Sequence, residues 1–185
     1  MITKHIISTN AHKVLSFLLA HPEKSFYERD IARKTGISYG SANAVLNSLY
    51  KDDVLQKTNT GKMSYYLIKT TSPFIKELKV LNNLLMLEPL IEKLKTCTHK
   101  VVLFGSWVLG SDSENSDIDI LIVTSQESNV RKLVDSFSEK LGKNIQAIIK
   151  KPADLINTNK RDSIFVNQLD KGKVLWEKEI DDSDI

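Results

Sequence analysis

Apolar residues in the first seventy positions recur at helical spacing and then alternate. In AHKVLSFLLAHP they fall at intervals of three and four between Val14 and Leu19, which predicts a helix that ends near Pro22. YERDIARKTG predicts a second helix capped by Gly36, and ISYGSANAVLNSLYKDD predicts a third that begins after Ser38. VLQKTNTGKMSYYLI reads as two strands joined by a Thr-Asn-Thr-Gly turn. The pattern therefore predicts three helices followed by a hairpin.

Residues 72–96 are dense in leucine, in the run FIKELKVLNNLLMLEPLIEKLK. Spacings of three and four predict one long helix, or two helices that meet near Pro89. We expect this segment, over 71–97, to connect two modules. Two arrangements suit so apolar a helix: it covers the core of its own domain, or it pairs with a second copy in a homodimer.

From residue 98 onward, short apolar strands alternate with amphipathic helices. HKVVLFG, DIDILIV, NIQAIIK and KVLWEK predict strands, ESNVRKLVDSFSEKLG predicts a helix ending at Gly142, and RDSIFVNQLDKG predicts a last helix over 161–172. This alternation predicts an α/β domain over 98–178, with helices packed on a sheet.

Charge is distributed unevenly along the 185 residues. Residues 1–70 hold ten Lys and Arg against five Asp and Glu, a net charge of +5, whereas the remainder is slightly acidic. This favours two modules with different partners. A single cysteine, Cys97, excludes an internal disulfide and fits a cytoplasmic protein. No apolar run is long enough to predict membrane insertion.

The chemistry concentrates in GSWVLGSDSENSDIDILIV, residues 105–123. Because side chains alternate along a strand, Asp117 and Asp119 share one face. Their backbones stand about 7 Å apart at the rise of an extended chain, so the carboxylates can converge on a hard divalent ion such as Mg²⁺. Gly105 and Ser106 follow a predicted strand, where a tight turn can hold phosphate. Together these features predict a site for a nucleoside triphosphate.

Gly105-Ser106, ten intervening residues and Asp117-Ile118-Asp119 resemble the signature of the DNA polymerase beta-like nucleotidyltransferase superfamily, in particular its minimal members. The resemblance implies transfer of a nucleoside monophosphate from a triphosphate, such as ATP, to an acceptor that the sequence does not identify. It implies that Asp117 and Asp119 are catalytic and bind Mg²⁺ or Mn²⁺, and that Gly105 and Ser106 bind the nucleotide. Small relatives often modify a helical partner protein, so a protein acceptor is one option.

The chain departs from this family pattern at the third carboxylate, which active members carry on a later strand. The matching strand is NIQAII, where the expected positions hold the neutral residues Asn144 and Gln146. Other acidic residues lie in the preceding loop, in the helix before that strand and beyond it: Asp112, Glu114, Asp135 and Asp154. Two outcomes stay open: a slow or specialised transferase, or a domain that binds nucleotide and metal without turnover.

Residues 8–70 resemble a winged helix-turn-helix domain, in which the third helix enters the major groove of double-stranded DNA. The resemblance implies a set of DNA-binding residues on that helix and on the hairpin: Ser38, Tyr39, Ser41, Asn43, Asn47, Lys51, Lys57 and Lys62. Because such folds also bind proteins or form dimers, a protein-docking role is the alternative.

The expected architecture is thus a two-domain α/β (α+β) chain. It comprises a winged helix-turn-helix domain over 8–70, a connecting helix over 71–97 and a nucleotidyltransferase-like mixed sheet with packed helices over 98–178. The function predicted is a metal-dependent nucleotidyltransferase with a DNA- or partner-binding module. The alternative is a DNA-binding transcriptional regulator whose degenerate transferase domain binds nucleotide without turnover.

Overall fold

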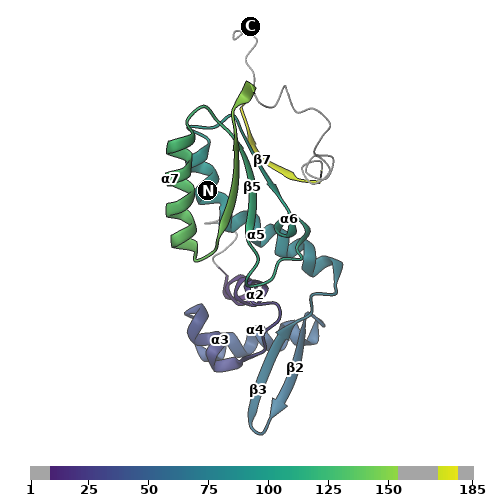
Figure 1. The fold of residues 1–185 in the computed structure, drawn as a ribbon. Coiled ribbons are helices and arrows are strands. Elements are labelled where there is room, and N and C mark those ends of the chain that lie inside the picture. Colours follow the sequence, from purple (N-terminus) through teal and green to yellow (C-terminus); the bar gives the residue numbers. More distant parts are fainter. Residues whose placement is uncertain (1–8, 154–170, 179–185) are drawn as a thin grey trace. The chain divides into compact units, whose positions relative to one another are not determined.

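The structure is a computed structural model that describes residues 9–153 and 171–178. The chain divides into two compact units, residues 1–85 and 86–185, and each contains helices and one β-sheet (Figure 1). The class is therefore mixed α/β, as predicted. Among the described residues, none of the helices combines the length and apolarity that a membrane span requires.

The first unit holds the three predicted helices and the hairpin. Its elements are α2 (Asn10–Ala20), β1 (Phe26–Tyr27), α3 (Glu28–Thr35), α4 (Tyr39–Lys51), β2 (Leu55–Thr60) and β3 (Met63–Ile68). The predicted caps are present, because Gly36 ends α3 at a φ of +67° and the Ser38 side chain accepts a hydrogen bond from the Ser41 amide. Strand β1 was not predicted; it pairs antiparallel with β3, so the sheet order is β1-β3-β2.

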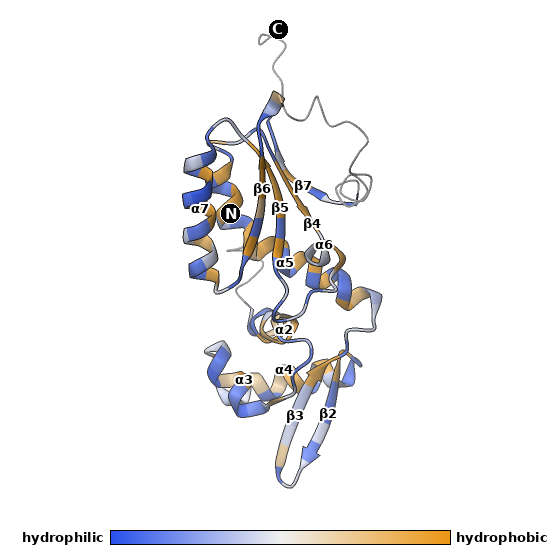
Figure 2. Cartoon of the chain, viewed as in Figure 1, coloured by the Kyte–Doolittle hydropathy of each residue, from blue (hydrophilic) through white to orange (hydrophobic). Residues whose placement is uncertain are grey.

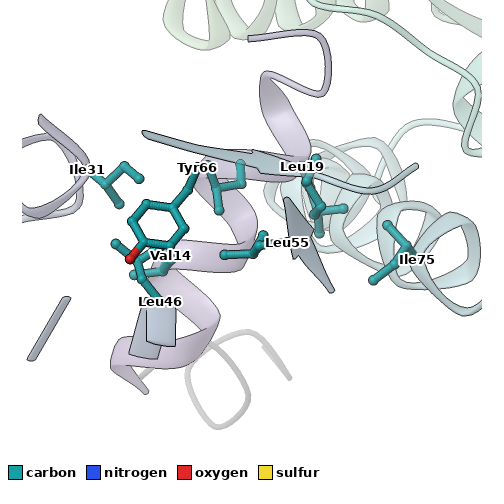
Figure 3. Packing of buried hydrophobic residues seen from close by; sticks show 9 residues of the cluster. Val14, Leu19, Ile31, Leu46, Leu55, Tyr66 and Ile75 are labelled. Carbon is teal, nitrogen blue, oxygen red and sulfur yellow. The ribbon is translucent and has the colours of Figure 1, made fainter. Parts of the chain in front are cut away.

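The core of the first unit joins all three helices to the hairpin. Figure 3 shows side chains from α2, α3, α4 and both long strands gathered around Tyr66, which has no exposed surface. Burying these apolar side chains supplies the main driving force for folding this unit, at about 25 cal/mol per Å² removed from water. The fully buried members include Val14, Ile31 and Leu46.

Residues Pro73–Leu94 form one helix, α5, with Pro89 inside it. The sequence predicted either one long helix or two helices that meet near Pro89, and the structure contains the single long helix. Pro89 lacks a backbone N–H, but Leu87 and Leu90 on either side are fully buried and anchor the helix at that point. The division between the two units falls within this helix.

The second unit is built on a four-stranded mixed sheet of order β6-β5-β4-β7. Its elements are β4 (Lys100–Phe104), α6 (Ser106–Leu109), β5 (Ile118–Val123), α7 (Glu127–Leu141), β6 (Ile145–Lys150) and β7 (Lys173–Glu177). Strand β4 is antiparallel to β5 and β7, whereas β5 and β6 are parallel and joined through α7, which packs against β6. Figure 2 shows the apolar character of the central strands. Most of the predicted last helix, 161–172, lies outside the described residues.

Candidate functional site

The two aspartates lie at the start of β5, a central strand of the second sheet. Asp117 directly precedes the strand and Asp119 is its second residue, and both side chains are partly exposed. Ile118 and Ile120 alternate with them and are fully buried. Ile118 and Ile120 therefore lie on one face of the strand. Asp117 and Asp119 lie on the other face, as the alternation of side chains along a strand predicts.

Gly105 brings the Gly-Ser turn directly against Asp119. Phe104 is the register partner of Asp119 in the antiparallel β4–β5 pair, so the turn after β4 begins beside the carboxylate. Gly105 has a φ of +74° and a ψ of −153°, a conformation that essentially only glycine adopts. A Cβ atom on Gly105 would lie 2.3 Å from Oδ2 of Asp119. The glycine is therefore required both for the backbone turn and for the space that the carboxylate occupies.

Ser106 follows as the first residue of α6, a single turn that packs against β4 and β5. Gly110 ends this turn at a φ of +63°, and the backbone oxygen of Ser106 accepts hydrogen bonds from the amides of Gly110 and Ser111. The structure therefore places Gly105 against Asp119, and Ser106 follows Gly105 directly in the chain. Asp117 joins them through the charge that it exerts on Asp119.

The strand expected to carry a third carboxylate supplies two amide groups instead. Strand β6 runs parallel beside β5, with Gln146 opposite Asp119. Asn144 Nδ2 donates to Oδ1 of Asp117 at 3.1 Å, and Gln146 Nε2 donates to Oδ2 of the same residue. Both oxygens of Asp117 therefore accept hydrogen bonds from neutral side chains, which orient that carboxylate.

The electrostatic environment differs for Asp119. Burial raises the pKa of the Asp119 carboxyl above its ordinary value, and the negative charge of Asp117 raises it further. Desolvation and a like charge both disfavour the ionised form. A bound cation would offset both penalties.

The loop between α6 and β5 is tied to the entrance of β6 by Lys143. Lys143 Nζ donates to the backbone oxygen of Glu114 at 2.7 Å and lies 5.6 Å from the centre of the Trp107 ring. Sequence reasoning did not identify Lys143, because nothing in its local pattern separates it from the other lysines. Lys143 directly precedes Asn144, so it connects the acidic loop and α6 to the entrance of β6 beside the carboxylates.

The other acidic residues do not complete a metal cluster within the described ranges. There, no group of three or more His, Cys, Asp and Glu side chains is arranged to hold a metal ion. Asp112 is buried in the loop, Glu114 contributes its backbone oxygen to Lys143, and Asp135 is exposed on α7. Asp154 lies outside the described residues.

In the first unit, three of the predicted DNA-binding residues, Tyr39, Asn43 and Asn47, take part in a hydrogen-bond network within the unit. Tyr39 Oη donates to Oε1 of Glu28, and Asn43 Nδ2 donates to Oε2 at 3.2 Å. Asn47 Nδ2 donates to Oδ1 of Asn43 at 2.9 Å, and Tyr66 Oη donates to Asn47. Glu28, which is 9% exposed, was not anticipated from the sequence because its partners lie on the next helix.

Of the remaining predicted DNA-binding residues, some make contacts within the first unit and two lysines are exposed. Ser38 caps α4 and bonds to Ser41 through both its oxygen and its hydroxyl proton. The ammonium group of Lys57 lies over the ring of Tyr66, 5.3 Å from its centre. Lys51, at the end of α4, and Lys62, in the hairpin turn, are exposed. These two lysines are therefore exposed, whereas Asn43 and Asn47 donate hydrogen bonds within the unit.

Comparison with known proteins shows the family to which this chain belongs. The family profile described as "Polymerase beta, Nucleotidyltransferase" matches residues 88–181. A putative protein adenylyltransferase of Methanocaldococcus jannaschii is 38% identical over 78 residues, which cover 42% of this chain and 77% of that relative. The chain belongs to the polymerase beta-type nucleotidyltransferase family. Members of this family generally use a divalent metal ion and a nucleoside triphosphate.

Three solved structures are similar to this chain at lower sequence identity. A toxin–antitoxin complex with AMP-PNP is 20% identical, with 52% of this chain and 75% of that chain covered and a TM-score of 0.38. A putative nucleotidyltransferase from Sulfolobus solfataricus is 17% identical, with coverage of 60% and 94% and a TM-score of 0.37. The adhesin competence repressor AdcR of Streptococcus pyogenes is 18% identical, with coverage of 76% and 87% and a TM-score of 0.39. TM-scores this low establish no shared function.

Proposed function

We propose that this chain is a metal-dependent nucleotidyltransferase that transfers a nucleoside monophosphate from a triphosphate to an acceptor hydroxyl. The observation that carries the proposal is the contact between Gly105 and the Asp119 carboxylate, with Asp117 beside it. A phosphate-sized ligand held at the Gly-Ser turn lies next to a carboxylate pair that gains from a cation. The family membership supports the same reaction class.

The donor set fits a divalent cation, because it offers carboxylate oxygens whose mutual repulsion a cation would relieve. Asp119 and Asp117 would hold the ion, either Mg²⁺ or Mn²⁺. When bound, that ion neutralises charge on the phosphates during an in-line displacement. The residues of the chain contribute position. Ser106 would donate a hydrogen bond from its hydroxyl to a phosphate oxygen, Gly105 lets the backbone approach closely, and Asn144 orients Asp117.

We further propose ATP as the nucleotide and a protein side chain as the acceptor. The named activity of the Methanocaldococcus jannaschii relative, protein adenylyltransferase, supports this choice. The described strand β6 supplies no carboxylate to remove the acceptor proton, since Gln146 stands opposite Asp119. Transfer is therefore expected to be slow unless the acceptor supplies its own base.

The first unit is proposed to act as a winged-helix docking module for DNA or a partner protein. Asn43 and Asn47 already donate hydrogen bonds within this unit. Contact with DNA would therefore be made to phosphates, through Lys51 and Lys62, rather than to base edges. The test is duplex binding at low and high salt: binding that falls steeply with salt, and that Lys51→Ala with Lys62→Ala weakens, supports DNA. Absence of binding at low salt leaves the protein-docking role, including a homodimer through α5.

A second candidate function is favoured by the amide groups of Asn144 and Gln146. With these neutral residues beside Asp117, the domain would bind nucleotide without turnover and act as a sensor within a DNA-binding regulator. Transfer of label from α-labelled ATP onto co-purifying protein separates the two functions. Label that appears supports the transferase, whereas nucleotide binding with no labelling over hours supports the sensor.

The site itself is tested by calorimetry with Mg²⁺ and a non-hydrolysable ATP analogue. Asp117→Asn combined with Asp119→Asn is expected to weaken binding by a factor of a hundred or more, on the order of 3 kcal/mol, because the cation loses both charged ligands. The matched control is Asp135→Asn with Glu139→Gln, which removes the same charge from exposed positions on α7. Equal affinity in the site variant and the control would show that the nucleotide binds elsewhere.

A further inference from the structure

The two sides of the carboxylate pair present opposite chemistry. On the β4 side, the Gly105 turn packs directly against Asp119. On the β6 side, Asn144 and Gln146 turn their amide N–H₂ groups towards Asp117. A cation approaching from the first side meets carboxylate oxygen, whereas a cation approaching from the second side meets the positive end of two amide dipoles.

The two carboxylates also differ in how far they are engaged. Each oxygen of Asp117 accepts one hydrogen bond from an amide, which uses part of its acceptor capacity. Among the described residues, none donates a hydrogen bond to the Asp119 carboxylate. Asp119 therefore keeps its coordination capacity, and it is the member of the pair beside the Gly-Ser turn.

The charges of the available ligands also distinguish the β4 side of the carboxylate pair from the β6 side. The pair carries two negative charges when ionised, which one divalent ion neutralises. The phosphates at the Gly-Ser turn supply anionic oxygens on the β4 side. A second ion on the β6 side, away from the phosphates, would need an anionic ligand from β6, and the register position opposite Asp119 holds the neutral side chain of Gln146. Since hard divalent ions select charged oxygen ligands, the β6 side lacks what a second ion needs.

We propose that this site binds one divalent cation per chain together with the triphosphate, on the β4 side of the pair and with Asp119 as its principal ligand. This inference rests on the proposed function, because it assumes that the nucleotide occupies the Gly-Ser turn. Gln146 is then the residue that sets the cation count, and Asn144 assists by holding Asp117 towards β6.

Equilibrium dialysis measures the count directly, with Mn²⁺ and a non-hydrolysable ATP analogue at saturating concentrations. The quantity is the number of Mn²⁺ ions and of nucleotides retained per chain in excess of the protein-free compartment. The wild-type chain is expected to retain one ion per nucleotide. Gln146→Asp is expected to retain two, and its Mn²⁺ affinity is expected to rise about tenfold.

The matched control is Asn129→Asp, which adds the same charge at an exposed position on α7 and should leave one ion and an unchanged affinity. Gln146→Glu provides a second variant, and circular dichroism confirms that each variant is folded. Two ions per nucleotide in the wild-type chain, or one ion in both folded Gln146 variants, would overturn this inference alone. No retained nucleotide in the wild-type chain would overturn the proposed function as well.

Discussion

Each unit contains a carboxylate that accepts hydrogen bonds from neutral side chains, and the two cases have opposite outcomes. Glu28 accepts from Tyr39 and Asn43, and the network continues to Asn47 inside the first unit. Asp117 accepts from Asn144 and Gln146, but a second carboxylate stands beside it. The hydrogen-bond chemistry is the same, yet only the second arrangement retains an electrostatic penalty that a cation can relieve.

The comparison shows what separates a structural polar cluster from a candidate site. A buried polar network stabilises a fold when each donor meets an acceptor and no like charges adjoin. At Asp119 the situation is the opposite, because burial first and the negative charge of Asp117 second raise the pKa of its carboxyl. Neither this carboxylate pair nor a turn that only glycine can form benefits the unliganded fold, and this supports the binding role that we propose for the site.

The largest expected loss of stability comes from Gly105→Ala, which disrupts the close approach between Gly105 and Asp119 in the second unit. The new Cβ would clash with Asp119 Oδ2, and the backbone conformation would be strained, for a combined loss of about 3 kcal/mol in the free energy of unfolding. Chemical denaturation measures this loss, and calorimetry should show that nucleotide binding disappears.

The control for Gly105 is Gly142→Ala in the same unit. Gly142 also has a positive φ, +68°, but a Cβ there meets no atom within 4 Å. It should lose only about 1 kcal/mol from backbone strain and retain nucleotide binding. If the two variants lose equal stability, the close approach to Asp119 is not what requires glycine at position 105.

A smaller effect is expected for Glu28→Gln in the first unit. Glutamine offers one oxygen and places an N–H₂ group against the donors Tyr39 and Asn43, so the free energy of unfolding should fall by about 1–2 kcal/mol. Nucleotide binding should not change. Glu23→Gln, the same substitution at an exposed position, should cost under about 0.5 kcal/mol. A matching loss in both variants would mean that the network contributes nothing.

The smallest expected effect is a change in Tm that reports the different electrostatic environments of Asp119 and Asp117. Because the pKa of Asp119 is raised in the folded state, its ionised form destabilises the fold at pH values above that pKa, and the penalty is absent below the ordinary value of 3.8. Asp119→Asn should therefore raise Tm at pH 7 by roughly 1–2 °C, discounted for partial exposure, and the gain should vanish as the pH falls below 3.8.

Asp117→Asn supplies the contrast, since it places an amide against the donors Asn144 and Gln146 and should not raise Tm. Differential scanning fluorimetry across pH measures both variants. Excess Mg²⁺ should stabilise the wild-type chain and reverse the advantage of Asp119→Asn. A gain in Tm for Asp119→Asn that persists at pH 3 would contradict the electrostatic explanation.

Periodicity in the sequence predicted most elements, because helices and strands depend on local spacing. The three front helices, the hairpin, α5, α7 and the strands of the second sheet follow the predicted segments. Strand β1 escaped prediction because two residues carry no period, and it exists only through its pairing with Tyr65 and Tyr66 on β3. Local spacing also could not show that Asn43 donates a hydrogen bond to Glu28, because the two residues lie on different helices.

By itself, the sequence determined that Asp117 and Asp119 share a face and that a Gly-Ser turn precedes them, because alternation along a strand needs no knowledge of neighbours. Only the tertiary structure decided which residues meet them. The β4–β5 pairing sets Gly105 against Asp119, and the parallel β5–β6 pairing brings Gln146 to Asp117 from 29 residues away. Strand order and register arise from packing the whole sheet, so contacts between distant residues follow from the fold and not from local pattern.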